Sequence, residues 1–280
     1  MGHIYEIQYL EHRNYDCPIQ KLDKDSYFHK KTGEVFDFNH IDTRADDTKS
    51  VKASLKKLRD YINANIDEPS FCKWVTLTYR QENGKPMQDT KKLYIDFKNF
   101  FKRFRYKFGS CEYIIACEPQ QSGAWHIHAL LIFPNKAPYI PNKVIEELWG
   151  QGFTKTQKLA NIDNIGAYLT AYLGDMPLEE AKKGHIDLNK AQIKTVSLSD
   201  SKIPKKFVKG ARMVFYPPNF NLYRISRGVK KPINELLTYK DAKKRIGNLK
   251  PTYSTSFTYS DSSSNFSTIV AYEHYNTKRV

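Results

Sequence analysis

The feature that most constrains the fold of this chain is a pair of apolar, strand-like segments joined by a short turn. The segments are CEYIIACEP (residues 111–119) and WHIHALLIF (residues 125–133), and the five residues between them include QQSG, which favours a turn. Alternate residues of a strand point to opposite faces of a sheet, and both faces of the second segment are largely apolar. The pattern therefore predicts an antiparallel hairpin whose second strand lies in the centre of a sheet.

The segments around this hairpin predict an α+β domain. The run FCKWVTLTYR (residues 71–80) is rich in β-branched and aromatic residues, which is typical of a strand. Three further segments have the pattern of helices and one alternates as a strand does, namely residues 90–109, 141–150 and 161–175 for the helices and 152–159 for the strand. We therefore expect the order β-α-β-β-α-β-α, in an antiparallel sheet with helices packed on one side and a nearly ferredoxin-like topology.

Composition divides the chain into four predicted parts. Residues 1–46 are polar and irregular and form an N-terminal extension, and residues 47–178 hold the α+β domain. Residues 179–249 form a C-terminal α/β section that is a candidate for recognising a binding partner. Residues 250–280 contain SDSSSNFS and are expected to form a flexible, serine-rich tail, in which TIVAYEHY (residues 268–275) could form a strand, for example on a partner.

The charge balance restricts the class of partner. Lysine and arginine total 45 against 30 acidic residues, a formal net charge of +15. Such a surplus favours a polyanion, most commonly nucleic acid, although a generally basic surface is the alternative. No apolar run approaches the roughly 18 residues that span a bilayer, and the amino-terminal residues are too polar for a secretory signal peptide. We therefore expect a cytoplasmic protein with no membrane partner.

Two histidines inside the apolar strand are the strongest functional signal. His126 and His128 share one face of their strand, and the preceding strand ends at Glu118, which the hairpin returns beside His126. Two imidazoles and a carboxylate together are suited to a divalent cation with open positions for substrate oxygens. The alternatives are that the histidines are satisfied core residues, or that Glu118 only neutralises a protonated histidine.

Two tyrosines complete the pattern. Tyr168 and Tyr172 are four residues apart in a predicted helix, so they project from the same helix face. Such pairs also arise by chance in a chain with 19 tyrosines. Their significance lies in the order of features: a threonine-containing strand, a glutamate, paired histidines, and then a helix with paired tyrosines.

This order resembles the HUH endonucleases, in which U is any hydrophobic residue, and specifically the rolling-circle replication initiators of small plasmids and phages. VTLTY (residues 75–79), EPQQSGAWHIH (118–128) and YLTAY (168–172) resemble the three family motifs in their two-tyrosine form. YPPNFNLYRISRGVKKP (216–232) further resembles the downstream region of replication proteins from plasmids of Gram-positive bacteria.

The resemblance implies an activity and a set of roles. A tyrosine would attack single-stranded or hairpin origin DNA, leaving a 5′-phosphotyrosine and a free 3′-hydroxyl, with Mg2+ or Mn2+ held by Glu118, His126 and His128. Tyr168 aligns with the nucleophile of one-tyrosine relatives and is expected to attack first, with Tyr172 making the closing transfer. The host would be a bacterium.

Further DNA contacts are expected from polar and basic residues of the domain, namely Thr76, Thr78, Arg80, Arg103 and Arg105. The alternative for the helix that bears the last two is an ordinary core-packing helix with a solvated charged face. Two departures from the family pattern matter. Ala171 stands where many relatives have a lysine, and the chain lacks G-x-x-x-x-G-K-[ST], so unwinding would fall to a host helicase.

Other functions remain open at this point. An HUH transposase uses the same chemistry, whereas conjugative relaxases place the tyrosine before the histidines and fit less well. A non-catalytic protein that binds the origin or single-stranded DNA, with structural histidines, is the alternative from a different class. A zinc hydrolase with a His2Glu site is the weakest alternative. The sequence makes no prediction of oligomeric state.

Overall fold

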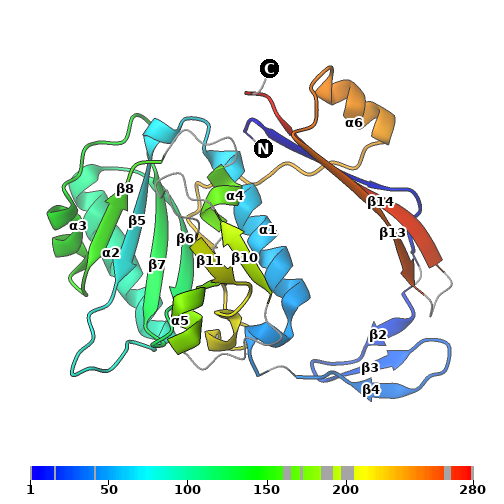
Figure 1. The fold of residues 1–280 in the computed structure, drawn as a ribbon, viewed down its shortest axis with the longest axis horizontal. Coiled ribbons are helices and arrows are strands. Elements are labelled where there is room, and N and C mark those ends of the chain that lie inside the picture. The colour runs from blue at the N-terminus through cyan, green and yellow to red at the C-terminus, as the bar shows by residue number, and fades with distance from the viewer. Residues whose placement is uncertain are drawn as a thin grey trace. The chain divides into compact units, whose positions relative to one another are not determined.

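The computed structural model describes residues 2–15, 17–40, 42–159, 165–170, 173–183, 192–196, 205–261 and 266–278 (Figure 1). The chain divides into two compact units. The larger unit consists of Met1–Gly2 and Asp42–Ile233, and the smaller unit consists of His3–Ile41 and Asn234–Val280. In the part of the chain that the structure describes, no helix is long and apolar enough to cross a membrane.

The larger unit contains five α-helices and eight strands among its described residues. The helices are α1 (Thr48–Asn65), α2 (Thr90–Phe108), α3 (Asn142–Trp149), α4 (Ile165–Thr170) and α5 (Leu178–Lys183), with 3-10 turns η1 (Arg44–Asp46), η2 (Pro69–Phe71) and η3 (Met213–Phe215). The strands are β5 (Cys72–Thr78), β6 (Glu112–Pro119), β7 (Trp125–Ile132), β8 (Thr154–Gln157), β9 (Met176–Pro177), β10 (Ile193–Val196), β11 (Lys205–Val208) and β12 (Tyr223–Ile225).

The central sheet has the strand order β12-β6-β7-β5-β8, and every neighbouring pair is antiparallel. From β5 to α4 the elements follow the predicted order β-α-β-β-α-β-α. The order of β6, β7, β5 and β8 is that of a ferredoxin-like sheet, to which β12 adds an edge strand. The α+β fold class and the central position of β7 are therefore confirmed.

Helix α2, which follows the loop after β5, illustrates how local sequence determines where a helix begins and ends. Asp89 caps α2 by accepting hydrogen bonds from the backbone N–H groups of Lys91 and Lys92. The helix ends at Phe108 and is followed by Gly109, whose φ of 84° favours glycine. Three phenylalanines of its apolar stripe, Phe97, Phe100 and Phe104, are buried against the sheet. Each such burial contributes roughly 1.5–3 kcal/mol relative to exposure.

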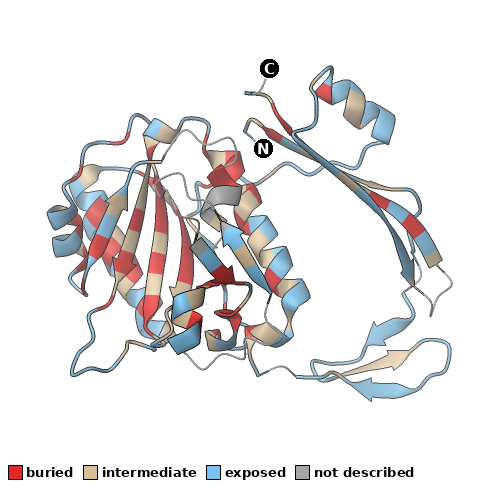
Figure 2. Cartoon of the chain, viewed as in Figure 1, coloured by how far each residue is buried: buried red, intermediate tan, exposed pale blue. Residues whose placement is uncertain are grey.

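Both faces of the sheet are covered, which corrects the expectation of helices on one side. α2 and α3 pack on the face that includes Ile127, Ala129 and Leu131 of β7. α1 and α4 pack on the other face, around Leu130. Figure 2 shows buried residues along the sheet strands and on the sides of the helices that pack against them. The physical reason is that β7 is apolar on both faces, so each face needs a cover.

The smaller unit is built from two three-stranded antiparallel sheets and one helix, as far as the structure describes it. One sheet has the order β1-β14-β13 and the other the order β2-β3-β4. The strands are β1 (Ile4–Leu10), β2 (Ile19–Lys21), β3 (Ser26–His29), β4 (Val35–Asp37), β13 (Tyr253–Asp261) and β14 (Phe266–Asn276), and the helix is α6 (Tyr239–Ile246).

The carboxyl-terminal segment corrects the prediction of a flexible tail, although β14 confirms the strand expected at residues 268–275. β13 and β14 form a hairpin, and β14 also pairs with β1 over seven residues. The amino-terminal and carboxyl-terminal parts of the chain therefore form one unit, whereas residues 1–46 and 250–280 were predicted as separate extensions. The larger unit extends to Ile233, beyond the predicted boundary at residue 178.

Candidate active site

The register of the central sheet brings the predicted site residues of β6 and β7 together. Glu118 lies directly opposite His126 in the β6–β7 pair, and Thr76 lies opposite His128 in the β5–β7 pair. Opposite residues of an antiparallel pair point to the same face. The centroids of the two imidazole rings are 6.5 Å apart. Glu118, His126 and His128 thus lie side by side on the face that α1 and α4 cover.

His128 is the histidine that the carboxylate contacts. Its Nε2 lies 2.7 Å from Glu118 Oε2, and its Nδ1 lies 3.3 Å from the hydroxyl of Thr76. The indole of Trp74 stacks on the ring at 5.6 Å between centroids. Thr76, which was predicted to contact DNA, lies beside Nδ1, where it can orient the imidazole.

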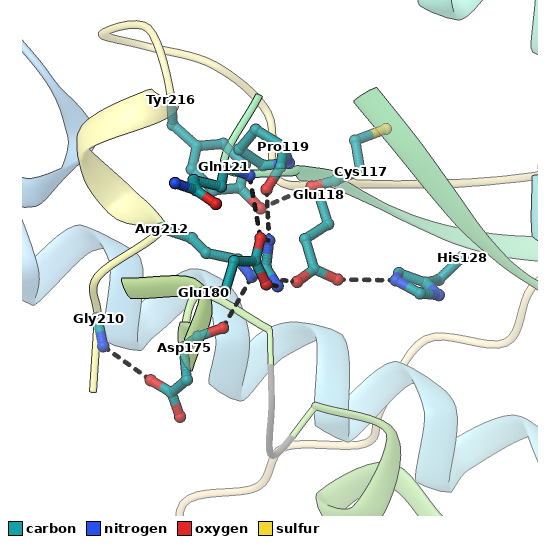
Figure 3. Close-up of polar contacts among 10 residues, drawn as sticks. All are labelled: Cys117, Glu118, Pro119, Gln121, His128, Asp175, Glu180, Gly210, Arg212 and Tyr216. Carbon is teal, nitrogen blue, oxygen red and sulfur yellow. Dashed lines mark hydrogen bonds and ion pairs between the residues drawn. The ribbon is translucent and has the colours of Figure 1, made fainter. Parts of the chain in front are cut away.

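The other oxygen of Glu118 contacts an arginine that the sequence analysis did not identify. Nε of Arg212 lies 2.6 Å from Glu118 Oε1, and Arg212 is buried (Figure 3). Its Nη2 and Nη1 groups lie 3.0 and 3.3 Å from the two oxygens of Glu180. It also donates to the carbonyl oxygens of Asp175 at 2.8 Å and Pro119 at 2.9 Å. One buried cation therefore compensates two carboxylates.

Hydrogen bonds of the neighbouring backbone fix this arginine in place. The N–H of Arg212 donates to the carbonyl of Gly174 at 2.9 Å. The hydroxyl of Tyr216, at the end of η3, donates to the carbonyl of Cys117 in β6 at 2.8 Å. Asp175 accepts from the N–H of Gly210 at 2.8 Å and pairs with Lys194. The sequence did contain a signal for this residue: Arg212 is the single charge inside the apolar run ARMVFY (residues 211–216). A charge that is buried with such a run needs a partner of opposite charge.

The electrostatics of the site differ between the carboxylate and His126. Burial alone would raise the pKa of Glu118, but the hydrogen bond and charge of His128 and the charge of Arg212 outweigh it and lower that pKa. Burial lowers the pKa of His126 to about 4, and the charge of His128 acts in the same direction. His126 is therefore neutral at pH 7, and its buried Nε2 meets no hydrogen-bond partner among the described residues.

The carboxylate of Glu118 and the imidazoles of His126 and His128 are chemical groups that commonly bind divalent cations. A neutral imidazole nitrogen is a metal ligand, and the unpartnered Nε2 of His126 is such an atom. The described residues nevertheless contain no three His, Cys, Asp or Glu side chains arranged around one metal position. Glu118 is engaged by His128 and Arg212, so an ion held by all three predicted ligands would replace the contact between Glu118 and His128.

The helix of the first tyrosine packs on the same sheet face as the histidines. Ile165 of α4 is buried in the cluster that contains Leu130 of β7, and the N–H of Gly166 donates to Asn63 Oδ1 of α1 at 2.9 Å. A Cβ at Gly166 would come within 2.6 Å of the carbonyl oxygen of Arg59, so only glycine allows this approach. Tyr168 lies in α4, but its side chain is outside the description.

Tyr172 lies outside the described residues.

The predicted DNA contacts are divided between the two faces of the sheet. Thr78 lies opposite His126 in the strand register, and Arg80 follows it along the chain. Arg103 and Arg105 lie on α2, on the opposite sheet face from the histidines.

Arg103 donates to the carbonyl of Leu148 at 2.6 and 3.0 Å, and Arg105 lies 6.0 Å from the ring centre of Phe101. The structure therefore does not bring these two arginines to the site. The DNA contact was predicted because this helix carries many cations. Sequence periodicity, however, does not reveal which sheet face a helix covers.

The fold and these side chains together define a class of protein: an α+β domain of ferredoxin-like strand order, with a histidine pair and a glutamate on the sheet face that a tyrosine-bearing helix covers. Residues 72–177 match the family model described as replication-associated protein ORF2/G2P. The match begins with β5, includes Glu118, His126, His128 and Tyr168, and ends with β9. It supports a role in the initiation of replication. No curated protein and no solved structure matches the chain.

Proposed function

We propose that the protein is a rolling-circle replication initiator of the HUH type, which nicks and rejoins single-stranded origin DNA through a 5′-phosphotyrosine. The observation that carries this proposal is the convergence of Glu118, His126 and His128 on the sheet face against which the helix of Tyr168 packs. The match of residues 72–177 to a replication-associated family supports it, because that range contains all four residues.

The proposed reaction exchanges one phosphodiester for another. The phenol oxygen of Tyr168 forms a bond to phosphorus while the bond from phosphorus to the 3′ oxygen breaks, and the proton lost by the phenol is balanced by one gained at the 3′ oxygen. The free 3′-hydroxyl can prime synthesis. Because the phosphotyrosine conserves the bond energy, attack by a 3′-hydroxyl rejoins the strand without ATP. Tyr172 provides the second acceptor for the closing transfer.

The chain's own side chains have distinct tasks in this proposal. Glu118, His126 and His128 would hold Mg2+ or Mn2+, which when bound polarises a phosphoryl oxygen. Thr76 orients His128 through its Nδ1, and Arg212 fixes the carboxylate of Glu118. Supporting contacts of this kind set the orientation of ligands and are costly to remove.

The distribution of charge supports a DNA substrate for the larger unit. The larger unit contains 33 basic and 19 acidic residues, a formal net charge of +14. The smaller unit contains 12 basic and 11 acidic residues, a net charge of +1. The unit with the candidate site therefore carries nearly all of the positive charge that attracts a polyanion. Single-stranded or hairpin origin DNA is the proposed substrate, and a host helicase the proposed source of unwinding.

A covalent-capture assay tests this function. The full-length protein is incubated with Mn2+ and a pool of random single-stranded oligonucleotides that carry a label at the 3′ end. We expect a labelled band at the mass of the protein plus DNA on a denaturing gel, because the 3′ portion stays on the tyrosine. Sequencing the captured DNA identifies the nick site, and EDTA should abolish capture.

Variants separate catalysis from binding. Glu118→Gln and His128→Ala should lose capture but keep DNA binding, while His12→Ala, an exposed histidine of the smaller unit, should behave as wild type. Binding without any adduct would instead support a non-catalytic origin-binding protein. That second function is favoured by one observation, namely that both oxygens of Glu118 already have partners. A transposase would share the chemistry, but the family match favours replication.

A further inference from the structure

The outer strand of the carboxyl-terminal hairpin is an open sheet edge. β13 pairs with β14 on one side, and no other strand pairs with its outer side in the described part of the chain. Seven of its nine residues are exposed. An edge strand presents a row of backbone N–H and C=O groups that can pair with another chain.

All but the last residue of this edge strand lack the features that usually protect such strands. Proteins commonly block an edge with lysine, proline or other charged residues within the strand. Residues 253–260 of β13, YSTSFTYS, contain none of these, and the charged residue of the strand, Asp261, lies at its end. The opposite edge of the same sheet, β1, differs, because its charged residue, Glu6, lies within the strand. It is also contacted by α6, where the rings of Tyr9 and Tyr239 lie 5.3 Å apart.

The residues of β13 also form a self-complementary pattern. Tyr253, Phe257 and Tyr259 share one face of the strand and are 55%, 51% and 51% exposed. Ser256 is midway between the two tyrosines. If two copies of β13 pair antiparallel around a two-fold axis at Ser256, Tyr253 of each copy lies opposite Tyr259 of the other. Such cross-strand aromatic pairs stabilise antiparallel sheets.

We propose that β13 is a dimerisation edge, at which two copies of this chain join their three-stranded sheets into one six-stranded sheet. Charge favours a second copy over nucleic acid as the occupant. The smaller unit has a net charge of only +1, so two copies of it can approach without the repulsion that two larger units at +14 would experience. A near-neutral strand also offers little attraction to phosphates.

The geometry sets the expected stoichiometry and strength. An isologous contact around a two-fold axis uses the same edge of each copy, so it closes at two chains. A nine-residue strand is smaller than the 20–30 residues per partner of a standard interface. We therefore expect a reversible dimer with a dissociation constant on the order of 10 μM.

Sedimentation velocity on the full chain over about 1 to 100 μM tests the dimer. The wild type should shift from monomer to dimer across this range. Ser256→Lys places two lysines opposite each other at the axis and should weaken association at least about tenfold. Ser267→Lys makes the same change at an exposed residue of the central strand β14, and it should leave association unchanged.

Disulfide trapping tests the register. In a Cys17→Ser background, which removes the exposed cysteine, Ser256→Cys should form a cross-linked dimer under mild oxidation. Ser254→Cys should not, because the two positions would be offset by four residues, about 13 Å, beyond disulfide reach. A monomer at every concentration, or equal association of wild type and Ser256→Lys, would overturn the proposal. A change in DNA affinity in Ser256→Lys that Ser267→Lys does not share, with unchanged mass, would assign the edge to DNA instead.

Discussion

Replacing Arg212 by methionine tests whether its buried contacts hold the larger unit together. The side chain is 10% exposed and faces carboxylates of Glu118 and Glu180 that are 14% and 25% exposed. Methionine preserves much of the volume but removes the charge and all five donor contacts. Removing one partner of a buried ion pair costs about 3–5 kcal/mol, because the remaining charge is buried without compensation. We expect Arg212→Met to lose this amount, a large part of the roughly 5–15 kcal/mol of a typical domain.

Urea unfolding followed by tryptophan fluorescence measures this loss in the correct unit. All three tryptophans, Trp74, Trp125 and Trp149, lie in the larger unit, so the smaller unit contributes no signal. Arg227→Met provides the matched control, because Arg227 is exposed and should change stability by less than about 0.5 kcal/mol.

A double substitution distinguishes ion pairing from simple packing. Glu118→Gln in the Arg212→Met background removes the uncompensated charge, so it should recover part of the lost stability. The explanation fails if Arg212→Met costs less than about 1 kcal/mol, or if the second substitution adds a full further loss.

Three further predictions concern the proposed chemistry and its electrostatics. Tyr168→Phe should remove most first-strand cleavage while Tyr172→Phe permits a nick but impairs closure, and peptide mapping of the DNA adduct would refute this order if only Tyr172 carried DNA. Affinity for single-stranded DNA should fall steeply with salt, because the larger unit has a net charge of +14; a flat dependence in anisotropy titrations would contradict backbone-dominated contacts. In metal-free protein, stability should decrease as the pH falls from 6.5 towards 4, by up to about 3 kcal/mol, because unfolded His126 takes up a proton that the folded imidazole, with a pKa of about 4, does not. Urea titrations of His126→Gln should lack this component.

Local patterns were sufficient for the central fold. The alternation along β7 assigned its residues to the correct faces, and the sequence order of the strands and helices from β5 to α4 is as predicted. Such features depend on neighbours within one element or hairpin, where periodicity and turn residues decide the outcome. The convergence of Glu118 with the two histidines followed for the same reason, because a connection of only five residues (120–124) left little freedom in the register.

The tail was predicted wrongly because composition was given more weight than alternation. Ser and Thr are frequent in linkers. In residues 253–259, however, Tyr253, Thr255, Phe257 and Tyr259 occupy every second position, and the positions between them are serine or threonine. Thr, Tyr and Phe all favour strands. The residues of β1 that pair with this hairpin lie 260–272 positions away in the chain, so no local pattern indicates that the hairpin has a sheet to join.

The contacts of Arg212 explain why the larger unit extends past the predicted boundary at residue 178. Arg212 joins Glu118 on β6 to the backbone of Gly174 and Asp175, which directly follow the segment of the two tyrosines. A fragment ending at residue 178 would bury Glu118 without its cation and would also lack Glu180. On the proposed function, the same guanidinium fixes the carboxylate ligand and the end of the tyrosine segment. On that proposal, a side chain outside the matched range of residues 72–177 would therefore position the carboxylate ligand.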